Sequence, residues 1–183
     1  VTLDFETYYD THYTLKKLST TEYIRHEKFK VQGVGIKYVH GRTKWFTGEG
    51  IARTLNRMDW GNIYLLCHHT HFDGLVLTHH FGHRPRYYLD TLSMSRPIHG
   101  GEVGGSLNKL AEYYGIGNKL PDILEETKGV YDLSPKLLGQ LGAYCKVDVE
   151  LTEKLFFTLL PLITCPLNTT DAAHHLPRLK PVG

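Results

Sequence analysis

The 183-residue sequence lacks any apolar run of the roughly 18 residues that a membrane-spanning helix needs. It also lacks a strong charge bias, with 21 basic against 19 acidic residues, so composition alone does not indicate a nucleic-acid-binding protein. A hydrophobic share of 41% excludes disordered and collagen-like chains. What remains is a globular domain without a membrane span, and the length fits one domain with a full core.

Cysteine is scarce and its pattern is uninformative for metal or disulfide chemistry. Cys67, Cys145 and Cys165 are odd in number, lie in or beside apolar runs and show no CxxC spacing. We therefore expect core thiols in a reducing compartment rather than a disulfide framework. The 12 histidines raise the alternative of a zinc-binding module. We disfavour it because the adjacent His79 and His80 cannot share one helix face and no cysteine set accompanies them.

Hydrophobic periodicity predicts a mixed α/β domain in which the first strand is central. Three strands, then helices and strands in alternation, give the order β-β-β-α-β-α-β. A helical turn and an irregular segment lie between residues 14 and 30, after the first strand. A long helical pattern begins at residue 134, and we expect two helices, broken near Gly139 or Gly142 and ended by Pro161. The expected elements are strands at 1–6, 31–39 and 43–46, a helix at 51–58, a strand at 62–67, a helix at 72–81, a strand at 87–90, and helices at 107–114 and 134–162.

Two carboxylates lie close together in the first expected strand. Asp4 and Glu6 are separated by one residue, so they share a face of the strand. Two such groups repel each other unless cations neutralise them, and hard oxygen ligands suit Mg²⁺ or Mn²⁺. Taken alone the pair is a weak signal, because this spacing also occurs at exposed strand edges.

Two further patterns place acids near element junctions or on one helix face. Asp73 follows the buried strand at 62–67 and falls at a strand-to-helix junction, where it could also serve only to complement the helix dipole. Tyr144 and Asp148 are four residues apart on the long helix, so they lie one above the other on one face. Each pattern is weak by itself, and the order of all three carries the argument.

In this order, from residue 4 to residue 148, the patterns resemble the three motifs of the DEDD superfamily of 3′–5′ exonucleases, in its tyrosine-bearing branch (DEDDy). The stretches at 88–96 and 106–115 are similar to proofreading domains of bacteriophage family A DNA polymerases. The resemblance covers residues 1–162 and implies a ribonuclease-H-like fold, a mixed β-sheet flanked by α-helices. Residues 163–183 would be a C-terminal tail or linker.

The resemblance also implies catalytic roles. Asp4, Glu6, Asp73 and Asp148 would hold two divalent cations, Mg²⁺ or Mn²⁺, with Asp4 bridging them. Two cations about 3.5–4 Å apart can activate a water and stabilise the leaving 3′ oxygen. Tyr144 would position the attacking water, since a phenol with a pKa near 10 is a poor base.

Three more residues are expected to contact the substrate. Thr7 follows the first acid pair as it does in the family and could touch the terminal nucleotide, and Phe72 is the aromatic residue of the second motif. The family has asparagine three residues before that aromatic residue, and here the position is His69. An imidazole cannot reproduce both functions of an amide, so substrate contact or pH dependence would differ.

The implied activity is removal of nucleoside 5′-monophosphates from the 3′ end of single-stranded DNA, in proofreading or DNA processing. One alternative is an RNA-trimming exonuclease of the ribonuclease D type, which uses the same acids, and another is a non-catalytic single-strand-binding module. We expect no membrane partner and a bacterial cytoplasmic location. Whether the domain is free-standing or works with a polymerase domain or subunit stays open.

Overall fold

The fold is that of a computed structural model, which describes residues 1–121 and 123–164. The observed succession confirms the predicted order of strands and helices as far as residue 90 and adds helices at 91–99 and 124–127 that were not predicted. Cys165 and nearly all of the predicted tail at 163–183 lie outside the described residues. In chain order the elements are β1 (Thr2–Thr7), α1 (Thr20–Arg25), β2 (Val31–Lys37), β3 (Lys44–Phe46), α2 (Glu49–Leu55), the 3₁₀ helix η1 (Trp60–Asn62), β4 (Tyr64–Cys67), α3 (Thr70–Phe81), β5 (Tyr87–Asp90), α4 (Thr91–His99), α5 (Leu107–Tyr114), α6 (Leu124–Thr127) and α7 (Pro135–Thr164).

The strands form one mixed sheet of five, in the order β3-β2-β1-β4-β5. Strand β1 pairs antiparallel with β2 and parallel with β4. Strands β2 and β3 form the predicted hairpin, and β4 pairs parallel with β5. This topology confirms the predicted α/β class and is consistent with a ribonuclease-H-like fold, with β1 as the central strand.

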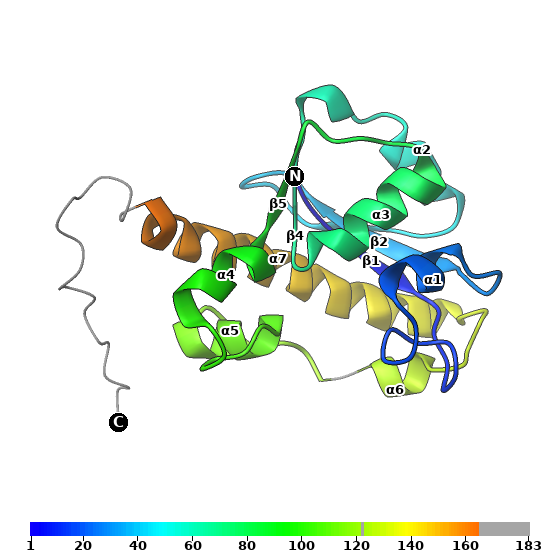
Figure 1. Cartoon of the computed structure of the whole chain (residues 1–183). Coiled ribbons are helices and arrows are strands. Elements are labelled where there is room, and N and C mark those ends of the chain that lie inside the picture. Colours follow the sequence, from blue (N-terminus) through cyan, green and yellow to red (C-terminus); the bar gives the residue numbers. More distant parts are fainter. Residues whose placement is uncertain (122, 165–183) are drawn as a thin grey trace, which may run out of the picture.

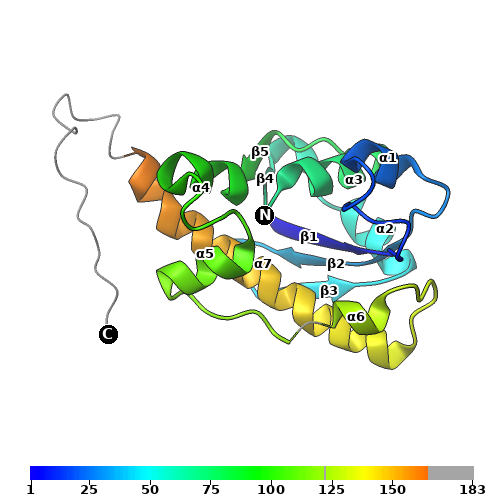
Figure 2. The ribbon, with the colours of Figure 1, turned by 60° about the horizontal axis from the view of Figure 1, so that its bottom comes forward.

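Helices flank the sheet on both faces (Figure 1). Helix α7 crosses one face against β1 and β2, and α3 with α1 lies over the other (Figure 2). Side chains alternate along β1, so they are divided between these two layers. The ring of Phe5 stacks on that of Phe81 of α3, with 5.7 Å between the ring centres. Asp4 instead contacts Cys145 of α7. The central strand therefore turns its acids toward α7 and its apolar residues toward α3.

Helix α7 is continuous, so the prediction of a break near Gly139 or Gly142 is wrong. A Cβ at Gly142 would lie 2.6 Å from the Trp45 ring, so this glycine lets the indole of β3 pack against the helix. Tertiary packing outweighs the weak helix propensity of glycine. Pro161 also does not end the helix, which continues to residue 164. A proline near a helix end removes only one of its backbone hydrogen bonds.

The two acids of β1 stand opposite two glycines of β2. In the antiparallel register Asp4 pairs with Gly35 and Glu6 with Gly33. A Cβ at Gly35 would lie 2.7 Å from the sulfur of Cys145. Helix α7 can come this close to the sheet only because position 35 has no side chain. The absence of a side chain at Gly35 therefore allows α7 to pack close to Asp4 and Glu6.

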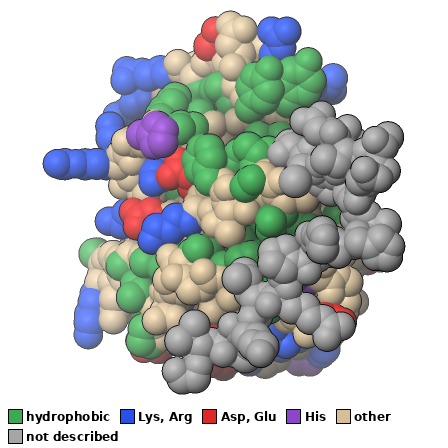
Figure 3. All heavy atoms as spheres, turned by 90° about the vertical axis from the view of Figure 1, so that its left-hand side faces the viewer, with side chains coloured by type: hydrophobic (Ala, Val, Ile, Leu, Met, Phe, Trp, Pro, Cys, Tyr) green, Lys and Arg blue, Asp and Glu red, His purple; other side chains and the backbone are tan. Residues whose placement is uncertain are grey.

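Helices α4 and α5 cover the C-terminal half of α7 through a second apolar cluster. This end of the molecule also exposes hydrophobic side chains, which Figure 3 shows in green beside charged groups. Within the described residues, no helix combines the length and apolarity needed to cross a lipid bilayer. The buried members of the second cluster are Leu107, Leu110, Ala111, Leu151, Leu155 and Leu159.

Candidate active site

Asp4 and Glu6 lie on the face of β1 that is turned toward α7. The Oδ2 atom of Asp4 lies 3.3 Å from the sulfur of Cys145, in the middle of that helix. One ligand atom from each of Asp4, Glu6 and Cys145 lies within 4.8 Å of the others. Both carboxylates are only half-buried, so a ligand can reach them from solvent.

Asp73 reaches the same strand from α3. It belongs to the first turn of this helix, which begins three residues after β4 ends, at the predicted strand-to-helix junction. Its side chain is buried, and Oδ1 accepts a hydrogen bond of 2.9 Å from the backbone nitrogen of Phe5. Since Phe5 stands between Asp4 and Glu6, the third acid is tied directly to the first two.

Tyr144 and Asp148 project from one face of α7, as their spacing predicts. Both are buried, and both contact Lys119, from the segment between α5 and α6. The Lys119 ammonium forms an ion pair with Asp148 and donates a hydrogen bond of 3.1 Å to the Tyr144 hydroxyl. Burial acts against its charge, yet the Asp148 carboxylate raises the pKa of Lys119 above its ordinary value.

The acids interact strongly through their charges. Removal from water, followed by the charge of Asp148, raises the pKa of Asp4 to about 6. Desolvation and the charge of Asp4 also raise the pKa values of Glu6 and Asp73. After desolvation, the charges of Asp4, Asp148 and Asp73 all act to raise the pKa of Glu6, so the four carboxylates influence one another's ionisation. Ionising this cluster is unfavourable unless a cation enters it.

The donor set fits hard divalent cations. Carboxylate oxygens suit Mg²⁺ and Mn²⁺, and Asp4, Glu6, Asp73 and Asp148 supply them. Burial raises the pKa of the Cys145 thiol well above its ordinary value, and a neutral thiol is a poor ligand. The oxygens, not the sulfur, would therefore hold the ions. Cys67 and Cys145 are both buried free thiols, as predicted.

The predicted substrate contacts fall at different depths. The Thr7 hydroxyl lies 2.9 Å from the Tyr23 hydroxyl, and the ring of Phe72 packs 6.0 Å from the same tyrosine. Phe72 is buried and belongs to a hydrophobic core cluster. His69 is exposed and precedes the first turn of α3 with a left-handed φ of 72°, while its backbone nitrogen donates to Asp90 Oδ1 at 2.8 Å. Of the three, His69 is the most accessible to a ligand.

Two residues of the site escaped the sequence-based prediction. Lys119 lies in a segment without helical or strand periodicity, so no spacing relates it to the acids. Cys145 was expected in the core, and only the structure shows its contact with Asp4. The one available signal for Cys145 was its position directly after Tyr144 in the sequence. Nothing in the sequence indicates Lys119.

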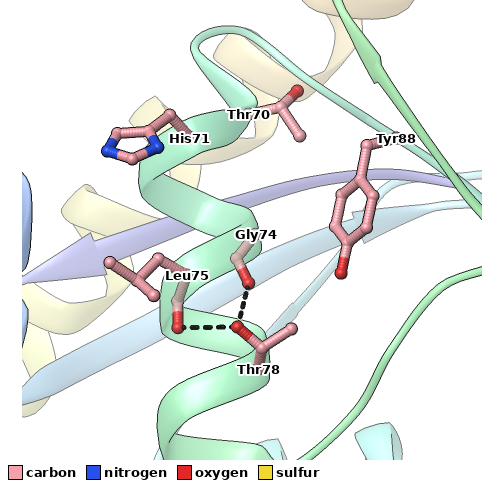
Figure 4. A pocket seen from close by; sticks show the side chains of 6 residues that line it. All are labelled: Thr70, His71, Gly74, Leu75, Thr78 and Tyr88. Atoms are coloured by element: carbon pink, nitrogen blue, oxygen red, sulfur yellow. Dashed lines mark hydrogen bonds between the residues drawn. The ribbon is translucent and has the colours of Figure 1, made fainter.

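A separate hollow of about 400 Å³ lies between α3 and β5, where Tyr88 faces the helix across Gly74 (Figure 4). Thr78 donates hydrogen bonds to the carbonyl oxygens of Gly74 and Leu75 at its floor. Its lining carries no carboxylate, so this hollow does not supply the ligands that divalent cations need. The lining residues are Thr70, His71, Gly74, Leu75, Thr78 and Tyr88.

Comparison with known proteins relates this chain to others through its fold. The sequence matches no known protein family and no curated protein. The structure is similar to a nuclease solved in its apo form, with a TM-score of 0.63 and 18% identity over 90% of this chain and 73% of the nuclease. It is also similar to the family B DNA polymerase of the archaeon Pyrobaculum calidifontis, with a TM-score of 0.60 and 18% identity. That match covers 88% of this chain but only 24% of the polymerase. The chain therefore shares the fold of these two proteins.

Proposed function

We propose that the chain is a 3′–5′ exonuclease that depends on two divalent cations and releases nucleoside 5′-monophosphates from single-stranded DNA. The observation that carries the proposal is the convergence of four carboxylates from β1, α3 and α7. Asp4 and Glu6 lie beside Cys145 of α7, and Asp73 of α3 accepts a hydrogen bond from the backbone between them. Asp148 of α7 is close enough for its charge to raise the pKa values of Asp4 and Glu6. The acids in such a cluster raise one another's pKa values, so their ionised form is favourable only where cations bind. The order of the acids along the chain is that of the DEDDy motifs, with Asp4, Glu6, Asp73 and Asp148 as ligands.

The protein's own residues divide the work of hydrolysis. When bound, the two cations would activate a water and stabilise the leaving oxygen. Burial and the Asp148 charge raise the pKa of Tyr144 to about 12, so the phenol stays neutral near pH 7. A neutral phenol donates a hydrogen bond and orients the attacking water or a phosphate oxygen, but it does not remove a proton. Thr7 and His69 would contact the terminal nucleotide.

The fold comparisons support a role beside a polymerase. The chain corresponds in fold to a nuclease and to a quarter of a DNA polymerase. A proofreading or DNA-processing role in a bacterial cytoplasm, with a polymerase domain or subunit as partner, agrees with these comparisons and with the phage-like motifs. DNA is the proposed substrate, and the test below includes RNA because the same acids can serve either sugar.

The proposal is tested by a time course on matched 5′-labelled single-stranded DNA and RNA oligonucleotides, with Mg²⁺, Mn²⁺, Zn²⁺ or EDTA. The variants are Asp4→Ala, which removes a proposed metal ligand, and Tyr144→Phe, which removes only the hydroxyl. Glu102→Ala serves as the matched control because Glu102 is an exposed carboxylate outside the cluster. Circular dichroism of each variant checks that it folds.

We expect a ladder that shortens from the 3′ end of DNA, with EDTA and Asp4→Ala abolishing it. Tyr144→Phe should retain metal binding and lose part of the rate, and Glu102→Ala should behave as the unmodified protein does. Faster trimming of RNA would replace the DNA assignment with the ribonuclease alternative. Equal, mild effects of Asp4→Ala and Tyr144→Phe, or no cleavage with any metal, would overturn the proposed roles.

A further inference from the structure

Lys119 is a cation placed among the acids by the chain segment that joins α5 to α6. Its nitrogen lies 3.1 Å from the Tyr144 hydroxyl and 5.0 Å from the centre of that ring. It also pairs with Asp148, one helical turn further along α7. The Lys119 side chain is 24% exposed and that of Asp148 is 11% exposed, so this ion pair is largely shielded from solvent.

The chemistry of the two groups fixes the direction of this hydrogen bond. An ammonium has three donors and no acceptor, so the Tyr144 oxygen must accept from Lys119. The phenol hydrogen cannot point at Lys119 and is left for another acceptor. Lys119 therefore sets which way Tyr144 donates, in addition to holding its oxygen in place.

We propose that Lys119 is a positioning residue, which turns the Tyr144 hydroxyl hydrogen toward the attacking water or a phosphate oxygen. The inference rests on the proposed exonuclease function. It gives Lys119 a role in the turnover step, acting through Tyr144. The inference requires Lys119 for neither DNA binding nor metal binding.

A purely structural role would have a different signature, and the chain supplies a control for it. Lys154 on α7 donates a hydrogen bond of 3.2 Å to the backbone oxygen of Ile116, three residues before Lys119. It anchors the same segment but lies outside the acid cluster. Lys154→Met therefore loosens the anchor while leaving the contact with Tyr144 in place.

The experiment measures kcat and KM on single-stranded DNA with Mn²⁺ for Lys119→Met, Lys119→Arg, Lys154→Met, Tyr144→Phe and the Lys119→Met/Tyr144→Phe double variant. Calorimetric titration with Mn²⁺, in the absence of DNA, gives the metal affinity of each. Thermal unfolding shows which variants fold. Lys119→Arg keeps a cationic donor, so it separates loss of the charge from loss of the fold.

We expect Lys119→Met to lower kcat by about ten- to a hundredfold, with KM little changed, because a misdirected group near the reacting atoms costs this much. In the Tyr144→Phe background the same change should lower kcat by no more than about threefold, the sign of two residues acting as a unit. Lys119→Arg should recover part of the rate. Mn²⁺ should bind Lys119→Met at least as tightly as before, since one positive charge has left the cluster.

Several results would overturn the inference. Effects of Lys119→Met and Tyr144→Phe that simply multiply would show that Lys119 does not act through the phenol. Weaker Mn²⁺ binding by Lys119→Met would show that it only holds Asp148, and an equal loss in Lys154→Met would show that it only anchors the segment. An unmodified protein without exonuclease activity would instead overturn the proposed function, and the two failures are thereby distinct.

Discussion

Asp73 Oδ1 accepts a hydrogen bond of 2.9 Å from the backbone nitrogen of Phe5, 68 residues earlier in the chain. The bond joins the first turn of α3 to the central strand, between the two acids of that strand. A buried carboxylate here both satisfies a strand nitrogen and completes the acid cluster. Its charge works against folding in the absence of metal, because burial and Asp4 raise the pKa of Asp73.

These two contributions of Asp73 can be separated by substitution. Asp73→Asn keeps an oxygen acceptor for Phe5 and removes the charge, so the metal-free protein should be at least as stable as before. Asp73→Ala leaves a buried nitrogen without its partner and should lower the free energy of unfolding by about 1–3 kcal/mol. Urea unfolding in EDTA measures both. Both variants should lose exonuclease activity, and equal stability losses would contradict the argument.

The contribution of the acid cluster to the stability of the metal-free protein should fall as pH rises. Desolvation and the Asp148 charge raise the pKa of Asp4 from 3.8 to about 6, so the folded state holds the proton more tightly than the unfolded chain. The resulting stabilisation is complete below about pH 4 and is lost as pH rises through about 6. The raised pKa values of Glu6 and Asp73 act in the same direction.

The lowered pKa values of His68, His80, His83 and His99 act in the opposite direction over the same range, so the acids are tested by comparison with Asp4→Asn. In EDTA, the melting temperature of the unmodified protein relative to that of Asp4→Asn should decline between about pH 5 and pH 8. Saturating Mn²⁺ should reverse the trend, because cations bind the deprotonated carboxylates and stabilise the folded state by mass action. A melting-temperature difference between the unmodified protein and Asp4→Asn that does not decline with pH in EDTA would contradict the proposed coupling of the acids.

The close approach of α7 to the sheet should depend on Gly35. A Cβ there would lie 2.7 Å from the Cys145 sulfur and 2.9 Å from Val149 Cγ2, so Gly35→Ala must shift these two side chains or the helix that carries them. We expect a loss of about 1–3 kcal/mol in the free energy of unfolding, as for other overpacked sites. The exonuclease rate should fall as well, since α7 carries Tyr144 and Asp148.

Gly139→Ala is the matched control for this overpacking, because nothing lies within 4 Å of a Cβ at that helical position. It should raise the free energy of unfolding by about 0.5–1 kcal/mol through helix propensity and leave the rate unchanged. Chemical denaturation and the DNA time course measure both effects. A Gly35→Ala protein as stable and active as Gly139→Ala would show that α7 can move without consequence.

The sequence could predict the acids because each rests on a local pattern. Alternation places Asp4 and Glu6 on one strand face, and a four-residue spacing does the same for Tyr144 and Asp148 on a helix. Asp73 follows a buried strand at a predictable junction. The structure brings these residues together, and their roles as ligands and catalysts remain predictions. The order of strands and helices likewise sufficed for the fold class.

Features set by packing between distant segments could not be predicted in this way. The contact of Lys119 with Asp148 joins positions 29 residues apart, and the segment that carries it has no periodicity. Gly142 indicated a helix break in the sequence but accommodates Trp45 in the structure. Glycine shows that a close approach is permitted without showing which partner makes it. The continuity of α7 followed from that partner, not from helix propensity.

The residue before α3 offers a gain-of-function test. His69 adopts a left-handed conformation with a φ of 72°, which asparagine tolerates better than most residues, and asparagine is the residue of the DEDDy motif here. His69→Asn should keep or raise the free energy of unfolding. It should raise kcat/KM on single-stranded DNA by about two- to tenfold, the value of one added hydrogen bond. His71→Asn is the control, because His71 is also exposed and lies within the helix. An equal gain in both variants, or a loss in His69→Asn, would show that the imidazole itself is suited to this site.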